Sequence, residues 1–279
     1  MSQSPYPETN QNPWSESGSK SSSPNQPLLG QSGSDESIQG ASQSPEGLGE
    51  GQVFEQRHWT MTEVVKDGNL SSRAWGVQAL SLLFMALTWS LILSKFPLSN
   101  LPLFGYHPLM QSLALVLLVQ SILVLQPTST PSAKKSALNV HQILNLGLSL
   151  PIFTAGATIM WYLHDQPGTK HFISWHGTVG TVVVVWSWFQ VLVGAASVWF
   201  DGKLLGGGAK AKAVWKWHRL SGYVLLPLFF LTAILGITET IWAKGNSSLL
   251  LRGAVAASLV GALVLLLLRV RTSKLPKLR

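Results

Sequence analysis

The sequence contains no cysteine and few charged residues. Without cysteine, the chain cannot form disulfides, iron–sulfur clusters, covalently attached haem or zinc sites built on thiolates. Charged residues make up 11% of the 279 residues, whereas hydrophobic residues make up 46%. So few charges cannot cover a soluble core of this size, and the 12 tryptophans favour a membrane interface. The composition therefore indicates a membrane protein.

Residues 1–70 differ in composition from the rest of the chain. Ser, Gln, Gly, Pro and Asn dominate this segment. Such a composition buries too little apolar area to offset the entropy lost on ordering. We predict a disordered polar tail over residues 1–70.

Six apolar runs follow the tail, and each reaches about 20 residues, the length of a helix that crosses a hydrocarbon core of about 30 Å. The runs lack the alternation of membrane strands. We predict an all-α membrane protein with six transmembrane helices over residues 71–270, followed by a basic tail over 271–279. The predicted spans are 75–94, 107–126, 138–163, 173–200, 217–238 and 249–268.

Basic residues concentrate on one side of this predicted topology. They precede the third and fifth helices and follow the sixth, and include Lys134, Lys135 and Lys216. The positive-inside rule places these loops and both termini in the cytosol. The net charge of +8 is thus a topology signal, and we expect no nucleic-acid partner.

Four histidines lie near the starts of four successive predicted helices: His107, His141, His176 and His218. Successive helices run in opposite directions, so their starts alternate between the membrane faces. His107 and His176 are therefore expected near the non-cytosolic face. His141 and His218 are expected near the cytosolic face.

Two histidines facing each other in a helix bundle suit the axial positions of a haem iron. Zinc would need more ligands than two per site, and no carboxylate is near in sequence. A single histidine at a helix start is more often an interfacial residue, but ionisable residues within a membrane are costly and mark functional sites. We predict a central four-helix bundle holding two haems.

The segments around these histidines resemble the cytochrome b561 family, in particular its stand-alone six-helix members. The resemblance covers roughly residues 75–268 and rests on four segments: FGYHPLMQ, NVHQILN, FISWHGTVG and WKWHRLSGYVLL. It implies two haem b groups, with iron ligated by His107 and His176 in one and by His141 and His218 in the other. It also implies a transmembrane oxidoreductase of the ascorbate-dependent type that forms a homodimer in the lipid membrane.

In the family, cytosolic ascorbate or a similar small reductant gives electrons that reach monodehydroascorbate or a ferric chelate on the opposite side. Candidate substrate-binding residues are Lys134, Lys135 and Arg219 for the donor, and Lys170 and His171 for the acceptor. These residues could equally be topology charges and loop residues. The chain also departs from ascorbate-handling members, which carry Arg where this chain has Gln126.

Two other functions fit the sequence. One is a haem-bearing electron-relay subunit of a larger membrane complex, which would share every histidine but need no ascorbate site. The other is a non-redox membrane scaffold with interfacial histidines, against which the pairing of the four histidines argues. The sequence does not identify the organelle.

Overall fold

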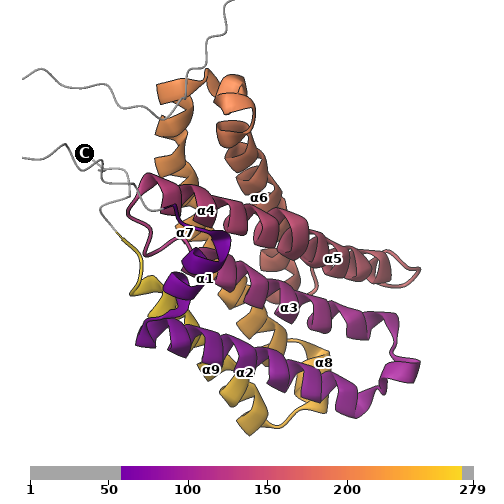
Figure 1. The fold of residues 1–279 in the computed structure, drawn as a ribbon. Coiled ribbons are helices and arrows are strands. Elements are labelled where there is room, and N and C mark those ends of the chain that lie inside the picture. Colours follow the sequence, from indigo (N-terminus) through magenta and orange to yellow (C-terminus); the bar gives the residue numbers. More distant parts are fainter. Residues whose placement is uncertain (1–57, 272–279) are drawn as a thin grey trace, which may run out of the picture. The chain divides into compact units, whose positions relative to one another are not determined.

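The computed structural model describes residues 58–271, which form helices and connecting loops and contain no strand (Figure 1). Residues 1–57 and 272–279 lie outside the described residues, so most of the predicted polar tail and of the basic C-terminal tail does too. Six helical stretches within 58–271 are long and apolar enough to cross a membrane. This confirms the prediction of an all-α protein with six transmembrane helices.

The six spans follow the predicted order, with somewhat different ends. They comprise α2 (Ser72–Lys95), α3 (Leu103–Leu123), α4 (Pro131–Gln142) continued by η2 (Ile143–Ser149) and α5 (Leu150–His164), α6 (Trp175–Val198) continued by η3 (Trp199–Leu205), α7 (Gly208–Thr238) and α9 (Leu249–Leu267). Two short elements, η1 (Leu98–Asn100) and α8 (Ile241–Asn246), lie in connections.

Polar caps determine where several spans begin. The hydroxyls of Ser71, Ser174 and Ser248 each accept a hydrogen bond from a backbone N–H in the first turn of α2, α6 and α9. Helix α7 begins at Gly208, nine residues before the predicted start at 217. The added turns contain Ala and Lys, both strong helix formers, so the helix extends through this stretch. The lysine charges are the reason why the predicted membrane span began only after it.

The third span changes its helical type after His141. Segment η2 is π-helical, and the N–H of Leu150 bonds to the carbonyl of Asn145, five residues earlier. Pro151 follows at once, and it cannot donate the α-helical hydrogen bond to the carbonyl of Gly147. A wider turn avoids the clash between the proline ring and that carbonyl.

The histidine-bearing helices form two packed pairs. Helix α3 packs along α5, and α6 packs along α7, whereas α5 and α6 touch more sparsely. Helices α2 and α9 pack along each other, and they contact α3 and α7 respectively (Figure 1). Buried Phe84, Leu123, Phe230 and Leu259 form the core where α2, α3, α7 and α9 meet.

The final part of the predicted disordered tail is a helix, so the prediction is wrong for those residues. Helix α1 (Met61–Asn69) begins with a capping box between Thr60 and Glu63. Val64, only 1% exposed, packs into an apolar cluster with residues of α4. Because the surrounding sequence is polar, its composition alone did not predict this short helix with one apolar face.

Arg269 joins the end of α9 to the junction between α1 and α2. Its guanidinium donates to the hydroxyl of Ser71 and, over 3.1 Å, to the carbonyl of Gly68. Burial, and next the nearby charge of Arg73, lower the pKa of Arg269 from its ordinary value.

Candidate functional site: two histidine pairs

His107 on α3 and His176 on α6 form the first histidine pair. Their ring centroids are 5.9 Å apart, and the ring planes are inclined by 83°. Both side chains are half-buried. They come from two different helix pairs, α3 with α5 and α6 with α7.

His141 on α4 and His218 on α7 form the second histidine pair. Each ring is near enough to feel a charge on the other, but within residues 58–271 the two make no ring-to-ring contact of the kind that joins His107 and His176. Both side chains are half-buried. Ser121, near the C-terminal end of α3, contacts His141, whereas His107 lies near the N-terminal end of the same helix. The two histidine pairs therefore lie toward opposite ends of α3.

Backbone carbonyls hold both rings of the first pair. Nδ1 of His107 lies 2.9 Å from the carbonyl oxygen of Gly156, and Nδ1 of His176 lies 2.8 Å from that of Thr232. A carbonyl can only accept, so Nδ1 carries the proton in both rings. Each Nε2 then keeps its lone pair, which is the state in which a histidine binds a metal.

The second pair has a different hydrogen-bonding environment. Nδ1 of His141 lies 3.3 Å from the carbonyl oxygen of Ser121 and 3.1 Å from the side-chain nitrogen of Asn145. Nδ1 of His218 is buried and has no hydrogen-bond partner among the described residues. Its backbone carbonyl accepts a bond of 2.5 Å from the side chain of Gln190 on α6.

Two glycines face histidine rings across the α6–α7 contact. A Cβ atom on Gly194 of α6 would lie 2.8 Å from Cε1 of His218. A Cβ atom on Gly236 of α7 would lie 3.0 Å from Cε1 of His176. Each ring on this helix pair thus occupies space that a side chain on the opposite helix would fill.

The cation group, defined here as Lys134, Lys135 and Arg219, comes from two helices. Lys134 and Lys135 are exposed in the first turn and a half of α4. Arg219 is half-buried on α7, directly after His218, and interacts electrostatically with it. The group therefore combines two solvent-facing charges on the helix of His141 with one charge beside His218.

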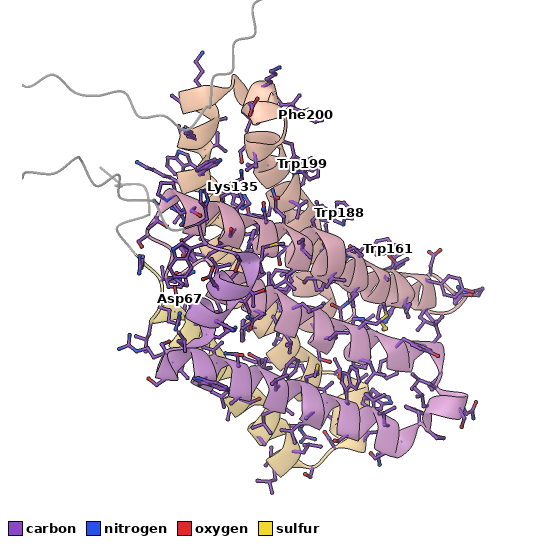
Figure 2. All side chains as sticks on the ribbon, viewed as in Figure 1. Asp67, Lys135, Trp161, Trp188, Trp199 and Phe200 are labelled. Carbon is purple, nitrogen blue, oxygen red and sulfur yellow. The ribbon has the colours of Figure 1, made fainter. Side chains whose placement is uncertain are left out.

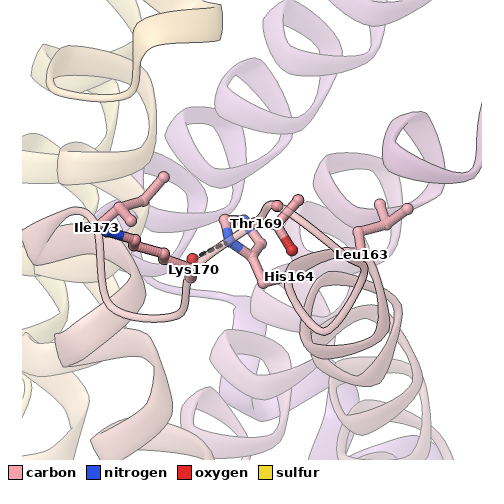
Figure 3. A pocket seen from close by; sticks show the side chains of 6 residues that line it. Leu163, His164, Thr169, Lys170 and Ile173 are labelled. Atoms are coloured by element: carbon pink, nitrogen blue, oxygen red, sulfur yellow. Dashed lines mark hydrogen bonds between the residues drawn. The ribbon is translucent and has the colours of Figure 1, made fainter.

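Lys170 and His171 lie in the loop between α5 and α6. Lys170 lines a cavity of 370 Å³, and its carbonyl oxygen accepts a 2.8 Å hydrogen bond from Nδ1 of His164 (Figure 3). The ring of His171 instead lies against that of Trp161, with centroids 4.2 Å apart and planes inclined by 33°, and its Nε2 lies 3.7 Å from an oxygen of Asp165. The structure thus gives these two neighbours different surroundings.

Gln126 lies in the turn three residues after the end of α3 and is buried, with only 7% of its surface exposed. Its side-chain nitrogen lies 3.3 Å from the carbonyl oxygen of Ile122 and 3.5 Å from the hydroxyl of Tyr223. The residue at this departure from the family pattern therefore packs between helices instead of facing solvent.

Aromatic side chains are exposed along the outer faces of several spans. Trp161, Trp188 and Trp199 are 52%, 43% and 45% exposed, and Figure 2 shows them on α5, α6 and η3. Exposed tryptophans on apolar helices are typical of surfaces that contact lipid.

Sequence reasoning missed several residues that surround the histidine rings. Gly194, Gly236 and Asn145 are among them, as is the carbonyl of Thr232. The sequence does contain a signal for Asn145, because a residue four positions after His141 lies on the same helical face. For the two glycines the sequence contains no such signal, because glycine is also common wherever membrane helices pack closely.

Comparison with known proteins identifies the family of this chain. Residues 106–244, which include all four histidines, match the family model of eukaryotic cytochrome b561. The chain is also 30% identical to the transmembrane reductase CYB561D2 of Bos taurus and of Homo sapiens. Each alignment covers 139 residues, 48% of this chain and 61% of the relative. The chain is a multi-pass membrane protein and belongs to the cytochrome b561 family.

Proposed function

We propose that this chain transfers electrons across a membrane through two b-type haems, one held by each histidine pair. The observation that carries the proposal is the first pair: two imidazoles 5.9 Å apart, each with Nδ1 bonded to a carbonyl. Both rings thereby offer Nε2 as a ligand. Family membership supports haem b as the bound group.

The residues present fit a haem on three grounds. Metal–imidazole bonds of about 2.1 Å place the centroids of two axial rings about 6–7 Å apart, close to the separation in the first pair. Two imidazoles per site match the two axial positions that a porphyrin leaves open. Among residues 58–271 no cluster of three or more His, Cys, Asp or Glu could hold a bare metal ion.

The side chains of each site have distinct tasks. When bound, haem iron supplies a one-electron carrier that alternates between the ferric and ferrous states. The carbonyls of Gly156 and Thr232 orient the first pair and fix its tautomers. With both histidines as ligands, the iron would have no free position for oxygen, which would favour electron transfer over oxygen chemistry.

The cation group suits a small anionic reductant such as ascorbate. Lys134 and Lys135 are exposed on the helix of His141, and Arg219 adjoins His218. The positive-inside rule puts this end, and both termini, in the cytosol. At the other end, Lys170 and His171 lie in the loop that precedes α6 and His176, where they would bind monodehydroascorbate or a ferric chelate.

A relay subunit of a larger complex is the second candidate, and Gln126 favours it. Its amide carries no charge, and it is buried against Ile122 and Tyr223 and so not available to an anionic donor. A relay subunit would accept electrons from another protein and would not need an ascorbate site.

Reconstitution in sealed vesicles separates these functions. The purified chain is placed in liposomes with ascorbate inside and a membrane-impermeant ferric chelate outside. Transmembrane reductase activity predicts ferrous iron outside at a rate well above that of vesicles carrying a His141→Ala variant. Haem that dithionite reduces but ascorbate does not would favour the relay subunit. Full haem reduction without external ferrous iron would exclude the ferric chelate as the acceptor, and reduction of only one of the two haems by internal ascorbate would refute transfer across the membrane.

A further inference from the structure

Three arginines lie where the start of α2 meets the end of α9 (Figure 1). They are called the arginine group here and comprise Arg73, Arg269 and Arg271. Nη1 of Arg73 donates over 3.4 Å to the carbonyl oxygen of Leu268, and Arg269 donates to the hydroxyl of Ser71. Each of these two guanidinium groups therefore contacts the segment from which the other comes, although the two segments are far apart in the sequence.

The arginine group gathers positive charge with little opposing charge. Burial, and next the charge of Arg73, lower the pKa of Arg269, and the charge of Arg271 lowers it further. Asp67 acts in the opposite direction. Within residues 58–271 none of the three arginines forms an ion pair with a carboxylate. A bound anion would relieve the repulsion among these neighbouring charges.

The two outer arginines of the group keep hydrogen-bond donors for a ligand. Arg73 and Arg271 are exposed, and each donates to one carbonyl oxygen, that of Leu268 and that of Pro127 respectively. A guanidinium carries several N–H donors in a planar fork that matches the oxygens of a phosphate group. Arg269 is half-buried and uses both terminal nitrogens to hold the junction of α1 and α2, so it adds mainly charge.

Exposed apolar side chains adjoin the arginine group. Leu70, Trp75 and Leu268 are each more than half exposed. Tryptophan, leucine and arginine together at the end of an apolar helix are typical of a membrane interface, where lipid headgroups lie above acyl chains. Free phosphate has no apolar part to cover such side chains. The surroundings therefore favour the phosphate of a lipid.

The arginine group lies toward the end of the bundle that holds the second histidine pair. Nη2 of Arg271 donates over 3.4 Å to the carbonyl oxygen of Pro127, which follows α3. Ser121, near that end of α3, contacts His141. The orientation proposed above puts this end at the cytosolic leaflet, which carries anionic phospholipids.

We propose that the arginine group binds the phosphate of an anionic phospholipid, with Arg73 and Arg271 donating to its oxygens. The bound headgroup holds the start of α2 against the end of α9, because it contacts an arginine from each. The site contains none of the four paired histidines, so it goes beyond the proposed function and does not depend on it.

The test is native mass spectrometry of the purified full-length chain, titrated with dioctanoyl phosphatidic acid. Dioctanoyl phosphatidylcholine, which has a phosphate but no net charge, is the reference lipid. We expect the wild-type chain to bind phosphatidic acid more tightly than phosphatidylcholine. Replacing Arg73 and Arg271 together with Gln should weaken the binding of phosphatidic acid about 25-fold, about fivefold for each charge removed, and leave that of phosphatidylcholine unchanged.

Two lysines at the other end of the same helices supply a matched control. Lys95 is exposed in the last turn of α2, and Lys244 is exposed in α8, just before α9. Lys95→Gln combined with Lys244→Gln removes the same charge from the chain as the arginine double variant. This control should bind phosphatidic acid as the wild type does.

Each result decides the question. Equal affinity of the wild type for the two lipids, or equal weakening in the arginine and lysine double variants, would overturn the site. Inorganic phosphate that displaces phosphatidic acid at equal concentration would assign the site to a soluble anion and overturn the lipid. Should the arginine double variant fail to fold, unchanged affinity in Arg73→Gln alone would refute the proposal. Wild-type protein without haem would bear on the proposed function alone.

Discussion

Replacing Gly194 with alanine should weaken haem binding at the second histidine pair and spare the first. The added Cβ would lie 2.8 Å from Cε1 of His218, whereas ordinary contacts begin at 3.4 Å. The ring or the helix must therefore move by about 0.6 Å. Overpacking of this kind costs about 1–3 kcal/mol.

If this free-energy cost falls on the haem-bound state alone, it lowers the affinity of the protein for haem by the same amount. A penalty of about 1–3 kcal/mol lowers affinity by roughly 5- to 150-fold. The assay is the rate at which haem passes from the purified protein to an excess of apomyoglobin. We expect haem loss from the variant in two phases, one faster than in the wild type and one at the wild-type rate, each corresponding to one haem.

Two further variants make this prediction specific. Gly236→Ala places a Cβ 3.0 Å from Cε1 of His176, so it should speed haem loss from the first pair instead. Gly253→Ala on α9 is the control, since its Cβ would meet nothing within 4 Å. Wild-type kinetics in both Gly194→Ala and Gly236→Ala, or loss of both haems from either, would refute the assignment of these glycines to separate haem sites.

Three other outcomes follow from the same geometry. Alanine at either member of the first histidine pair should remove one and the same haem, and alanine at either member of the second pair should remove the other; absorption spectra that show a common loss across the pairs would contradict the pairing. Changing the whole cation group to alanine should slow haem reduction by ascorbate severalfold with haem content unchanged, and equal stopped-flow rates would exclude it as the donor site. Val64→Asp should detach α1, because it places a charge at a position only 1% exposed; trypsin should then cleave faster after Lys66 in α1 and after Arg73 in the first turn of α2, while a digestion rate equal to wild type would show that α1 is held by other contacts.

The sequence was sufficient for the number and order of the spans, because a membrane helix needs a long apolar run and little else. It was less informative about their ends. The start of α7 at Gly208 lies in a lysine-rich stretch, and α1 is a nine-residue helix in a polar segment. Both depend on tertiary packing and caps, which composition does not encode.

The pairing of the histidines could be derived from helix direction alone, and the structure places the rings of His107 and His176 5.9 Å apart. The groups that orient these rings could not be derived in the same way. The carbonyl acceptors belong to Gly156 and Thr232, and a backbone carbonyl leaves no signature in the side-chain sequence. Contacts between distant helices, such as Gly194 with His218, depend on the exact rotation of each helix.

The most direct test of the central proposal is the haem-to-protein ratio of the detergent-purified wild-type chain, measured with its reduced-minus-oxidised spectrum. Two histidine pairs predict two low-spin b-type haems per chain. A ratio of one would contradict the assignment of one of the pairs. A folded protein without haem would contradict the proposal as a whole and leave the four histidines as structural residues.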